Sequence, residues 1–299
     1  LRSVIDTFHP DVIHCHLLHD HWVAALALRG RDPRPLLVRT LHKFTSPYHD
    51  PIHKILFTKL TDGIIAPSQA MHTMFLECYP HMEDRVHAIP GGVNLQRFHP
   101  DSDGLAIRRQ LNISPDEPVA GLVSRLRNDR GLHWLFDSLK LVFSKNPRIR
   151  FIIVGRGEMD LEVRHWITHE PFRDRVIMAG YRKRDLQDAY AAMNAALFLA
   201  QGSEGGSRSI MEAMGCARPV IAATCGAVPE MIRDSVTGYL VTKDDAGALA
   251  DRILDILKDT KRAADMGREA RIFAENRYRL LERAEQIMDF YEALQSRKS

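Results

Sequence analysis

The sequence predicts an α/β protein with two parallel-sheet domains and a helical tail. Short apolar runs alternate with helix-like or turn-rich segments along residues 11–92, which is the pattern of βαβ units. The alternation stops in a polar stretch with proline and glycine at residues 100–117 and then restarts. Residues 245–295 repeat apolar side chains at the 3.6-residue spacing of helices.

The expected strands are apolar runs bounded by polar or turn-forming residues. In the first half they lie at residues 12–16, 36–42, 62–68 and 86–92. In the second half they lie at residues 119–126, 149–155, 175–180, 195–200, 219–224 and 237–241. Amphipathic segments such as 132–143 and 185–193 separate the strands, and residues 1–8 also have a helical pattern.

Composition argues against nucleic-acid-binding and membrane-spanning proteins. The formal net charge is +3 over 299 residues, and no window has the dense run of Lys and Arg that a nucleic-acid footprint needs. No apolar run approaches the roughly 20 residues that span a bilayer, and we expect no leader sequence. The four cysteines form no CxxC pair, which favours a reducing, cytoplasmic compartment.

Residues 11–22, DVIHCHLLHDHW, contain four histidines (His14, His16, His19 and His21) and Asp20 within a span of eight residues. Imidazoles and carboxylates are zinc ligands, so a metal site is one interpretation. However, the alternation of Ile13 and Cys15 with His14 and His16 predicts the end of a strand, where neighbouring side chains point to opposite faces. Open α/β sheets bind ligands at such ends. We therefore expect no metal here, and contact with a substrate stays open.

Residues 202–222, GSEGGSRSIMEAMGCARPVIA, run from an expected strand through an acidic, glycine-containing turn into a helix. Free backbone N–H groups at a helix start bind phosphate. Glu204 lies in the turn and Glu212 lies in the helix. A local alternative is that Ser209 and Glu212 form an S-x-x-E capping box, in which Glu212 only caps its own helix.

This segment resembles the signature of the retaining GT-B glycosyltransferases of family 4, in which a glutamate, a glycine-containing turn and an EAM sequence precede G-x-P-V. Further segments are similar to elements of the family in the same order. They are DVIHCH, LVRTLHKF, GIIAPSQA, IPGGVNLQRFHP, SRLRNDRG, IIVGRGE, VIMAGY and GAVPEMIRDSVTGYLV. The resemblance covers nearly the whole chain and implies two Rossmann-like domains that face a cleft.

The resemblance implies that the second domain binds a nucleotide-diphosphate sugar. Arg125 and Arg130, in SRLRNDRG, are similar in position to the family's diphosphate-binding Arg and Lys. The leaving diphosphate gains negative charge while the sugar becomes oxocarbenium-like. Where no metal ion is bound, cationic side chains must stabilise the charge on the diphosphate. We expect no metal and no other cofactor. Without the other motifs, this loop would be interpreted as solvated basic surface.

The resemblance also implies the other site residues. Glu212 would accept hydrogen bonds from the ribose hydroxyls, and Glu204 would face the donor sugar in a catalytic position. His42, at a strand end, would lie by the anomeric carbon, although such a histidine taken alone is more often structural. The remaining implied donor contacts are Gly180, Tyr181, Gly205, Gly206, Ser207, Arg208 and Ser209.

The expected domains are a partial acceptor-side domain at residues 1–102, a donor-binding domain at 103–280 and a C-terminal helix at 281–299 that crosses back to the first domain. The family normally opens with a strand and a glycine-rich loop, which nothing in residues 1–10 resembles. The chain also starts at Leu1 and not at Met. We therefore expect the first domain to be incomplete.

Three alternatives stay open. A nicotinamide-dependent oxidoreductase could use the Gly155-x-Gly157 pair, but Asp160 stands where the dinucleotide fingerprint needs a third glycine. A metal-dependent GT-A transferase could use the D-x-D of residues 101–103, but this lies in the expected linker and not after a strand. A non-catalytic subunit of the same fold could bind a nucleotide sugar without turnover.

The function that the sequence favours is metal-independent transfer of a sugar from a nucleotide-diphosphate donor to a hydroxyl acceptor, with retention of anomeric configuration. The acceptor would be a glycan, a lipid-linked molecule or a small molecule, as in polysaccharide or glycolipid biosynthesis. Basic and apolar residues at 42–60 leave peripheral membrane contact open, although a solvated helix with one buried face is the favoured interpretation.

Overall fold

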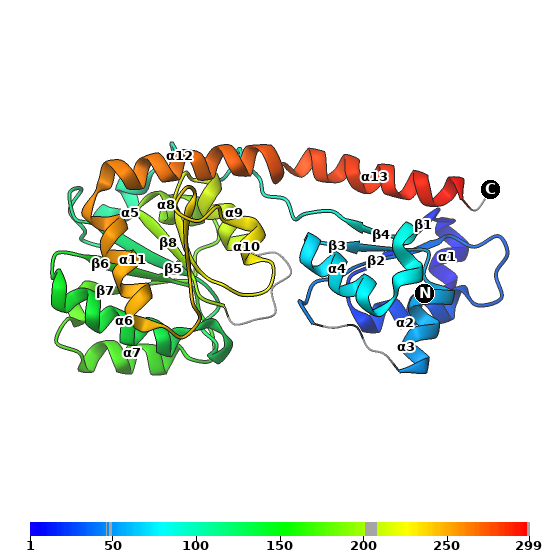
Figure 1. Ribbon diagram of the computed structural model, residues 1–299, viewed down its shortest axis with the longest axis horizontal. Helices are drawn as coiled ribbons and strands as arrows, with labels where there is room; N and C mark the ends of the chain where they lie inside the picture. The colour runs from blue at the N-terminus through cyan, green and yellow to red at the C-terminus, as the bar shows by residue number, and fades with distance from the viewer. Residues whose placement is uncertain (46, 48–49, 201–207, 298–299) are drawn as a thin grey trace. The chain divides into compact units, whose positions relative to one another are not determined.

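The computed structural model describes residues 1–45, 47, 50–200 and 208–297, and the chain divides into two compact units (Figure 1). Of the described residues, 1–91 and 280–297 form unit 1, and 92–200 and 208–279 form unit 2. Unit 2 begins at Gly92, earlier than the expected boundary after residue 102. The cause is that the backbone N–H of Val93 donates to the carbonyl of Tyr278, and Phe98 packs in the core of unit 2.

Unit 1 contains a four-stranded parallel sheet in the order β1-β2-β3-β4. Its strands coincide with the four apolar runs expected in the first half: β1 (Val12–Cys15), β2 (Leu36–Thr40), β3 (Gly63–Ala66) and β4 (Val86–Ala88). Side chains on β2 alternate between faces, as a strand requires. Leu36 and Val38 pack against α13 (Leu280–Ser296), whereas Leu37 packs against α1 (Arg2–Phe8) and α2 (Leu18–Leu28).

Side chains bond to backbone N–H groups at the starts of some helices of unit 1, although α1 has no side-chain cap. Asp20 accepts hydrogen bonds from the backbone of His16 and Leu17 at the start of α2, and Ser68 caps α4. The remaining helical segments of the unit are α3 (Pro51–Ile55), a π-helix (Leu56–Leu60), α4 (Gln69–Cys78) and a 3-10 turn (Pro80–Arg85).

Helix α13 packs on the sheet of unit 1 through Phe290 and Leu294. A Cβ atom on Gly63 would lie 2.5 Å from the side chain of Leu294 and 2.9 Å from that of Phe290, so a larger residue would force these side chains to shift. The expected C-terminal helix is thus present and belongs to the same unit as residues 1–91.

Unit 2 contains a six-stranded parallel sheet in the order β10-β9-β8-β5-β6-β7. Its strands coincide with the six runs expected in the second half: β5 (Val119–Val123), β6 (Arg150–Val154), β7 (Val176–Gly180), β8 (Ala195–Phe198), β9 (Val220–Ala223) and β10 (Gly238–Val241). The chain order reverses between β5 and β8, because the strands that follow β5 and β8 are added on opposite sides. A doubly wound sheet places its ligand crevice at this point.

Two helical layers cover the sheet of unit 2, as two-sided burial of a parallel sheet requires. Leu135 and Leu139 of α6 pack with Leu249 and Ile253 of α11 on one side. Ile210 and Met214 of α9 pack with Ala270 of α12 on the other side. The helices are α5 (Gly104–Gln110), α6 (Leu132–Lys145), α7 (Asp160–His169), α8 (Leu186–Ala191), α9 (Arg208–Gly215), α10 (Val228–Met231), α11 (Ala246–Lys258) and α12 (Thr260–Arg277), with 3-10 turns at Asn128–Arg130 and Arg173–Arg175.

In the described part of the chain, none of the helices combines the length and hydropathy that a bilayer span requires.

Candidate functional site

The reversal point of the unit 2 sheet brings together the two segments that carry the main sequence motifs. β5 and β8 are hydrogen-bonded neighbours, with Ala120 opposite Ala195 and Leu122 opposite Leu197. The arginine-containing loop follows β5, and the segment that leads to α9 follows β8. A Cβ atom on Gly131 would lie 2.5 Å from the carbonyl oxygen of Leu199, so the start of α6 touches the end of β8.

The loop after β5 is held by its one buried side chain, Leu126. The backbone N–H of Leu126 donates to the carbonyl of Arg156 at 3.2 Å, and its own carbonyl accepts from Met159 at 3.1 Å. With Leu126 fixed, its neighbour Arg125 is exposed to solvent. Arg130 lies at the end of the same loop with a side chain only 18% exposed, and its Nε is 3.4 Å from Asp129. Arg125, Arg127 and Arg130 thus all lie in the loop that follows β5.

The glycines of VGRGE explain a second feature of this edge. Gly155 has φ +144°, and a Cβ atom there would lie 1.8 Å from the carbonyl oxygen of Ser124. A Cβ atom on Gly157 would lie 2.2 Å from the carbonyl of Leu126. Both glycines therefore let the loop after β6 close against the loop after β5. This packing accounts for the Gly-x-Gly pair without a dinucleotide.

Glu212 lies in the middle of α9 with only 8% of its surface exposed. Its Oε2 accepts a hydrogen bond of 3.2 Å from the hydroxyl of Tyr190 on α8. Burial raises the pKa of Glu212 to about 7, although the Tyr190 hydroxyl, Arg208 and Arg97 act in the opposite direction. A buried carboxyl with a raised pKa, next to the reversal point of a sheet, is a typical candidate for ligand contact.

The structure does not support the capping-box interpretation of Glu212. α9 begins at Arg208, so Ser209 lies inside the helix and does not precede it. The carboxyl of Glu212 instead bonds to a residue of another helix. Arg208, the first residue of α9, is exposed. Four further predicted site residues lie outside the described residues: Glu204, Gly205, Gly206 and Ser207.

Gly180 and Tyr181 lie at the end of β7, on the same edge as the arginine loop. Gly180 has φ +71°, and its carbonyl accepts from the N–H of Gly155 at 2.9 Å. Tyr181 is 58% exposed, and the guanidinium carbon of Arg156 lies 4.7 Å from the centre of its ring. An exposed ring with a cation over its face offers a stacking surface.

His42 belongs to unit 1 and follows β2. Its Nε2 lies 3.0 Å from Nδ1 of His16, which follows β1, so the two strand ends carry a hydrogen-bonded imidazole pair. His14 stacks on His16 with ring centroids 4.6 Å apart. The ring of His14 is fixed at both nitrogens, by Tyr291 at 2.5 Å and by Thr40 at 2.7 Å.

Burial governs the charge of these histidines. It lowers the pKa of His14 to about 4 and also lowers the pKa of His42, and the neighbouring His16 adds to both effects. Both imidazoles are therefore neutral near pH 7 and suit hydrogen bonding to hydroxyl groups. Among the described residues, no group of three or more His, Cys, Asp or Glu side chains has the arrangement of a metal site.

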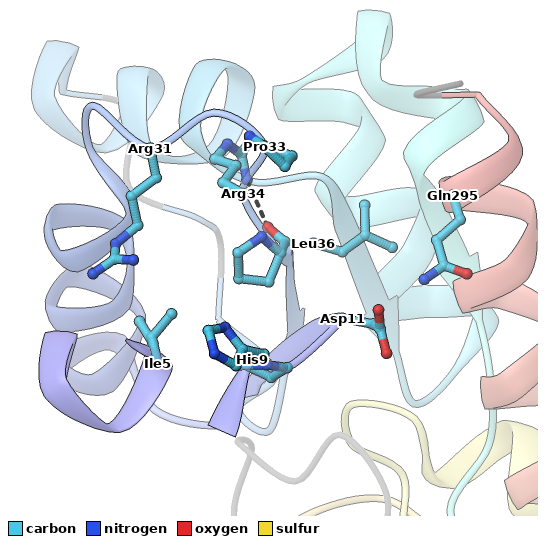
Figure 2. Close-up of a pocket in the computed structure, with 10 residues that line it drawn as sticks. Ile5, His9, Asp11, Arg31, Pro33, Arg34, Leu36 and Gln295 are labelled. Carbon is cyan, nitrogen blue, oxygen red and sulfur yellow. Dashed lines mark hydrogen bonds between the residues drawn. The ribbon is translucent and has the colours of Figure 1, made fainter. Parts of the chain in front are cut away.

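A separate open pocket of about 550 Å³ lies in unit 1 at the amino ends of β1 and β2 (Figure 2). Asp11 and Leu36, at the starts of these strands, line it, whereas His16 and His42 lie beyond the other ends of the strands. Its arginines are already paired: Arg31 with Asp6 at 2.6 Å, and Arg34 with Asp62 at 2.7 Å. We therefore do not assign this pocket to the donor site.

The structure adds residues that sequence reasoning did not assign to the site. Tyr190 is 22 residues before Glu212, on a different helix, so no local pattern connects them. Arg156 lies between the two glycines of VGRGE and becomes relevant only because its side chain reaches Tyr181. His16 was part of the conspicuous histidine cluster, but the sequence did not show that His42 is its partner.

The D-x-D sequence of residues 101–103 has a structural role. Asp103 precedes α5 and its Oδ1 accepts from the backbone of Ala106 at 2.9 Å, as a helix cap does. Its own N–H donates to Asp188 at 2.9 Å. This arrangement agrees with the interpretation of the sequence as part of a loop.

Comparisons with known proteins point to one family. Residues 104–273 match the family model described as glycosyl transferases group 1, and residues 1–97 match the model of glycosyltransferase family 4. A similar solved structure is that of Anabaena HepE in complex with UDP, with a TM-score of 0.86 and 28% identity. The superposition covers 97% of this chain and 81% of HepE.

Two curated relatives are also glycosyltransferases. N-acetyl-alpha-D-glucosaminyl L-malate synthase of Bacillus anthracis is 25% identical over 95% of this chain and 74% of its own length. A GDP-mannose-dependent mannosyltransferase of Corynebacterium glutamicum is 28% identical over 62% of this chain, and the match spans about half of that protein, 51%. The two family matches, the parallel-sheet units and the HepE structure agree: the chain belongs to glycosyltransferase family 4, glycosyl transferases group 1, and has the GT-B fold.

Proposed function

We propose that the protein transfers a sugar from a nucleotide-diphosphate sugar to a hydroxyl-bearing acceptor, with retention of anomeric configuration and without a metal ion. The observation that carries the proposal is the reversal point of the unit 2 sheet. There, Arg125 and Arg130 lie in the loop after β5, while α9, with its buried carboxyl, follows the neighbouring β8. This arrangement offers cations for a diphosphate and an acceptor group for ribose hydroxyls at one edge.

Arg125 and Arg130 are the proposed diphosphate contacts. As the bond to the sugar breaks, negative charge grows on the leaving diphosphate, and guanidinium groups stabilise it through charge-assisted hydrogen bonds. A planar guanidinium at residue 130 can bind two phosphate oxygens at once, which a lysine ammonium cannot do in the same geometry. Stabilisation of this kind replaces the Lewis acid that metal-dependent transferases use.

The remaining roles follow the family resemblance. We propose that Glu212 receives the ribose hydroxyls and that Glu204 faces the donor sugar. The base would lie near Gly180 and Tyr181, where an exposed ring is available for stacking. His42 would bind a sugar hydroxyl close to the anomeric carbon, which suits its neutral imidazole. The other proposed donor contacts are Gly205, Gly206, Ser207, Arg208 and Ser209.

The relatives' names support a nucleotide donor. The HepE structures contain UDP and UDP-glucose, and the Corynebacterium protein is named for GDP-mannose and a phosphatidylinositol mannoside. The Rhizobium meliloti relative LpsB is named for lipopolysaccharide core biosynthesis. These names span more than one base and acceptor, so the base of this protein's donor is a matter for measurement.

The test is the thermal unfolding of the protein with UDP, GDP, ADP and NAD in turn, each with and without a chelator. A ligand that binds only the folded state raises the midpoint temperature of unfolding. At a ligand concentration of 100 times the dissociation constant, it increases the free energy of unfolding by about 2.7 kcal/mol. We expect one nucleoside diphosphate to raise the midpoint equally in both conditions, and NAD to have no effect. A shift with NAD alone, or one abolished by the chelator, would contradict the proposal.

Turnover separates an enzyme from a non-catalytic subunit of the same fold. The measurement is release of the nucleoside diphosphate from the matching nucleotide sugar, with a panel of hydroxyl acceptors. The proposed enzyme releases the diphosphate in the presence of its acceptor. Tight donor binding without release under any acceptor would support the non-catalytic alternative.

Replacing Glu212 by alanine is expected to weaken binding of the nucleoside diphosphate about 10- to 100-fold. The physical reason is that hydrogen bonds to a charged acceptor contribute roughly 1.5–3 kcal/mol. Titration calorimetry measures the effect. The control is Glu162→Ala, because Glu162 is exposed on α7. If both variants bind as the unchanged protein does, Glu212 has no role in donor binding.

A further inference from the structure

The geometry points to Tyr190 as a positioning residue for the donor site: its hydroxyl holds one oxygen of the Glu212 carboxyl, so that the other oxygen faces the ribose. This inference rests on the proposed role of Glu212 and adds a residue that touches no substrate atom. Its basis is the hydrogen bond between two side chains on different helices, each of them buried.

The position of the Tyr190 hydroxyl is determined by packing. Only 1% of the residue's surface is exposed, and its ring makes an edge-to-face contact with Phe98, with centroids 6.1 Å apart. From this fixed ring the hydroxyl reaches Oε2 of Glu212 at 3.2 Å. A second link, from Sγ of Cys216 to the carbonyl of Gln187 at 3.6 Å, joins the same pair of segments. Tyr190 therefore presents its hydroxyl to α9 from a rigid support.

The chemistry of a phenol makes this contact directional. Burial raises the pKa of Tyr190 well above its ordinary value, so the hydroxyl keeps its proton throughout the pH range near neutrality. The hydroxyl has one proton to donate, and it donates this proton in a hydrogen bond to Oε2 of Glu212. An ionised carboxylate accepts hydrogen bonds on both oxygens. With Oε2 held by Tyr190, Oε1 remains for the ribose.

The surroundings of Glu212 make the hydroxyl important for the charge of the carboxyl. Burial favours the neutral acid and gives a pKa of about 7, and the Tyr190 hydrogen bond is the foremost of the contributions that favour the carboxylate. The groups that act on the charge of Glu212 are Tyr190, Arg208 and Arg97. Cys216, which follows α9, lies near the same carboxyl and is affected in turn by Arg218, Arg271 and Asp188. Removing the hydroxyl therefore raises the pKa of Glu212 further and leaves its side chain free to turn.

The test is UDP and GDP binding by titration calorimetry between pH 6 and pH 9, comparing the unchanged protein with Tyr190→Phe. The carboxylate is the form that accepts ribose hydrogen bonds, so affinity should fall as pH drops below about 7. In Tyr190→Phe we expect the pH at which affinity is half lost to rise by about one unit, and the affinity at pH 7 to fall about 5- to 20-fold. At pH 9 most of the carboxyl groups are ionised in both proteins, and the difference should shrink.

Two further variants make the result specific. Tyr278→Phe is the matched control, because Tyr278 is 3% exposed in the same unit and packs edge to face on Phe273. It should leave both the affinity and its pH dependence unchanged. Glu212→Gln should bind UDP or GDP weakly at every pH, and adding Tyr190→Phe to it should cause no further loss, since the residue that Tyr190 positions is already altered.

The outcomes separate this inference from the proposed function. An unchanged pH profile and affinity in Tyr190→Phe, with weakened binding in Glu212→Gln, would overturn the role of Tyr190 alone. Unchanged binding in Glu212→Gln would overturn the donor role of Glu212 and, with it, the role of Tyr190. No binding of UDP, GDP or ADP by the unchanged protein would overturn the proposed function. A loss of affinity in Tyr190→Phe that is equal at every pH, together with a lower unfolding midpoint, would show a structural role and contradict positioning.

Discussion

Replacing Arg125 and Arg130 together by alanine is expected to weaken binding of the nucleoside diphosphate about 100- to 10,000-fold. Each guanidinium is proposed to make charge-assisted hydrogen bonds to the diphosphate, worth roughly 1.5–3 kcal/mol per residue, and the two contributions add. Calorimetry with UDP or GDP measures the loss. Removing the Arg125 side chain should change the stability of unit 2 little, because Arg125 is exposed and the loop is anchored by Leu126.

The matched control is Arg127→Ala. Arg127 lies in the same loop, is exposed and carries the same charge, and its Nε, like that of Arg130, is 3.4 Å from Asp129, but no phosphate contact is proposed for it. If the effect of the double variant came only from net charge, Arg127→Ala would reproduce part of it and added salt would erase the difference. Equal affinities of Arg127→Ala and the double variant would argue against direct contact with phosphate.

Replacing Gly155 by alanine is expected to lower the free energy of unfolding of unit 2 by at least about 3 kcal/mol. The added Cβ atom would lie 1.8 Å from the backbone oxygen of Ser124, and a side chain is strained at φ +144°. The added Cβ atom would meet backbone atoms of Ser124, which cannot turn away as the end of a side chain can. The loops after β5 and β6 would therefore have to separate. Urea unfolding followed by the fluorescence of Trp134 and Trp166, both in unit 2, measures the change.

Alanine substitutions at two other glycines distinguish the cost of backbone strain from the cost of steric overlap. Gly30 has φ +80° with nothing within 4 Å of an added Cβ atom, so Gly30→Ala should cost only about 1–2 kcal/mol of backbone strain. Gly247, in α11, has ordinary space and an ordinary φ, so Gly247→Ala should be neutral or stabilising by up to about 1 kcal/mol. If Gly155→Ala costs no more than Gly30→Ala, close packing of the two loops is not what requires glycine.

Most of the secondary structure could be predicted from the sequence, because the strands are mostly apolar runs between polar or turn-forming residues. β3 and β9, for example, are buried at every residue, as strands covered on both faces are, and so they read as continuous apolar runs. The boundary between the units was less accessible. Residues 93–98 lie between an expected strand and the expected linker, and only their contacts with Tyr278 and the unit 2 core assign them to unit 2.

The site was accessible only where its residues follow a strand in a recognisable order. Arg125, Arg130 and Glu212 belong to segments that resemble the family, and the structure puts those segments after two neighbouring strands. The capping-box alternative failed because the position of a helix start cannot be fixed from Ser209 alone. The partner of the Glu212 carboxyl comes from a helix that precedes β8, and no periodicity in the sequence links the two.

The sequence by itself thus determined the order of strands and helices, the family, and which residues follow each strand, because these depend on local hydrophobic patterns and on contiguous motifs. Tertiary structure alone decided which strand ends are neighbours, that His16 faces His42, and that Tyr190 donates to Glu212. The physical reason is the distance along the sequence over which each property is determined. A pleat or a helical turn repeats within a few residues, whereas the pKa of a carboxyl and the partner of an imidazole depend on burial and on side chains that only folding brings together.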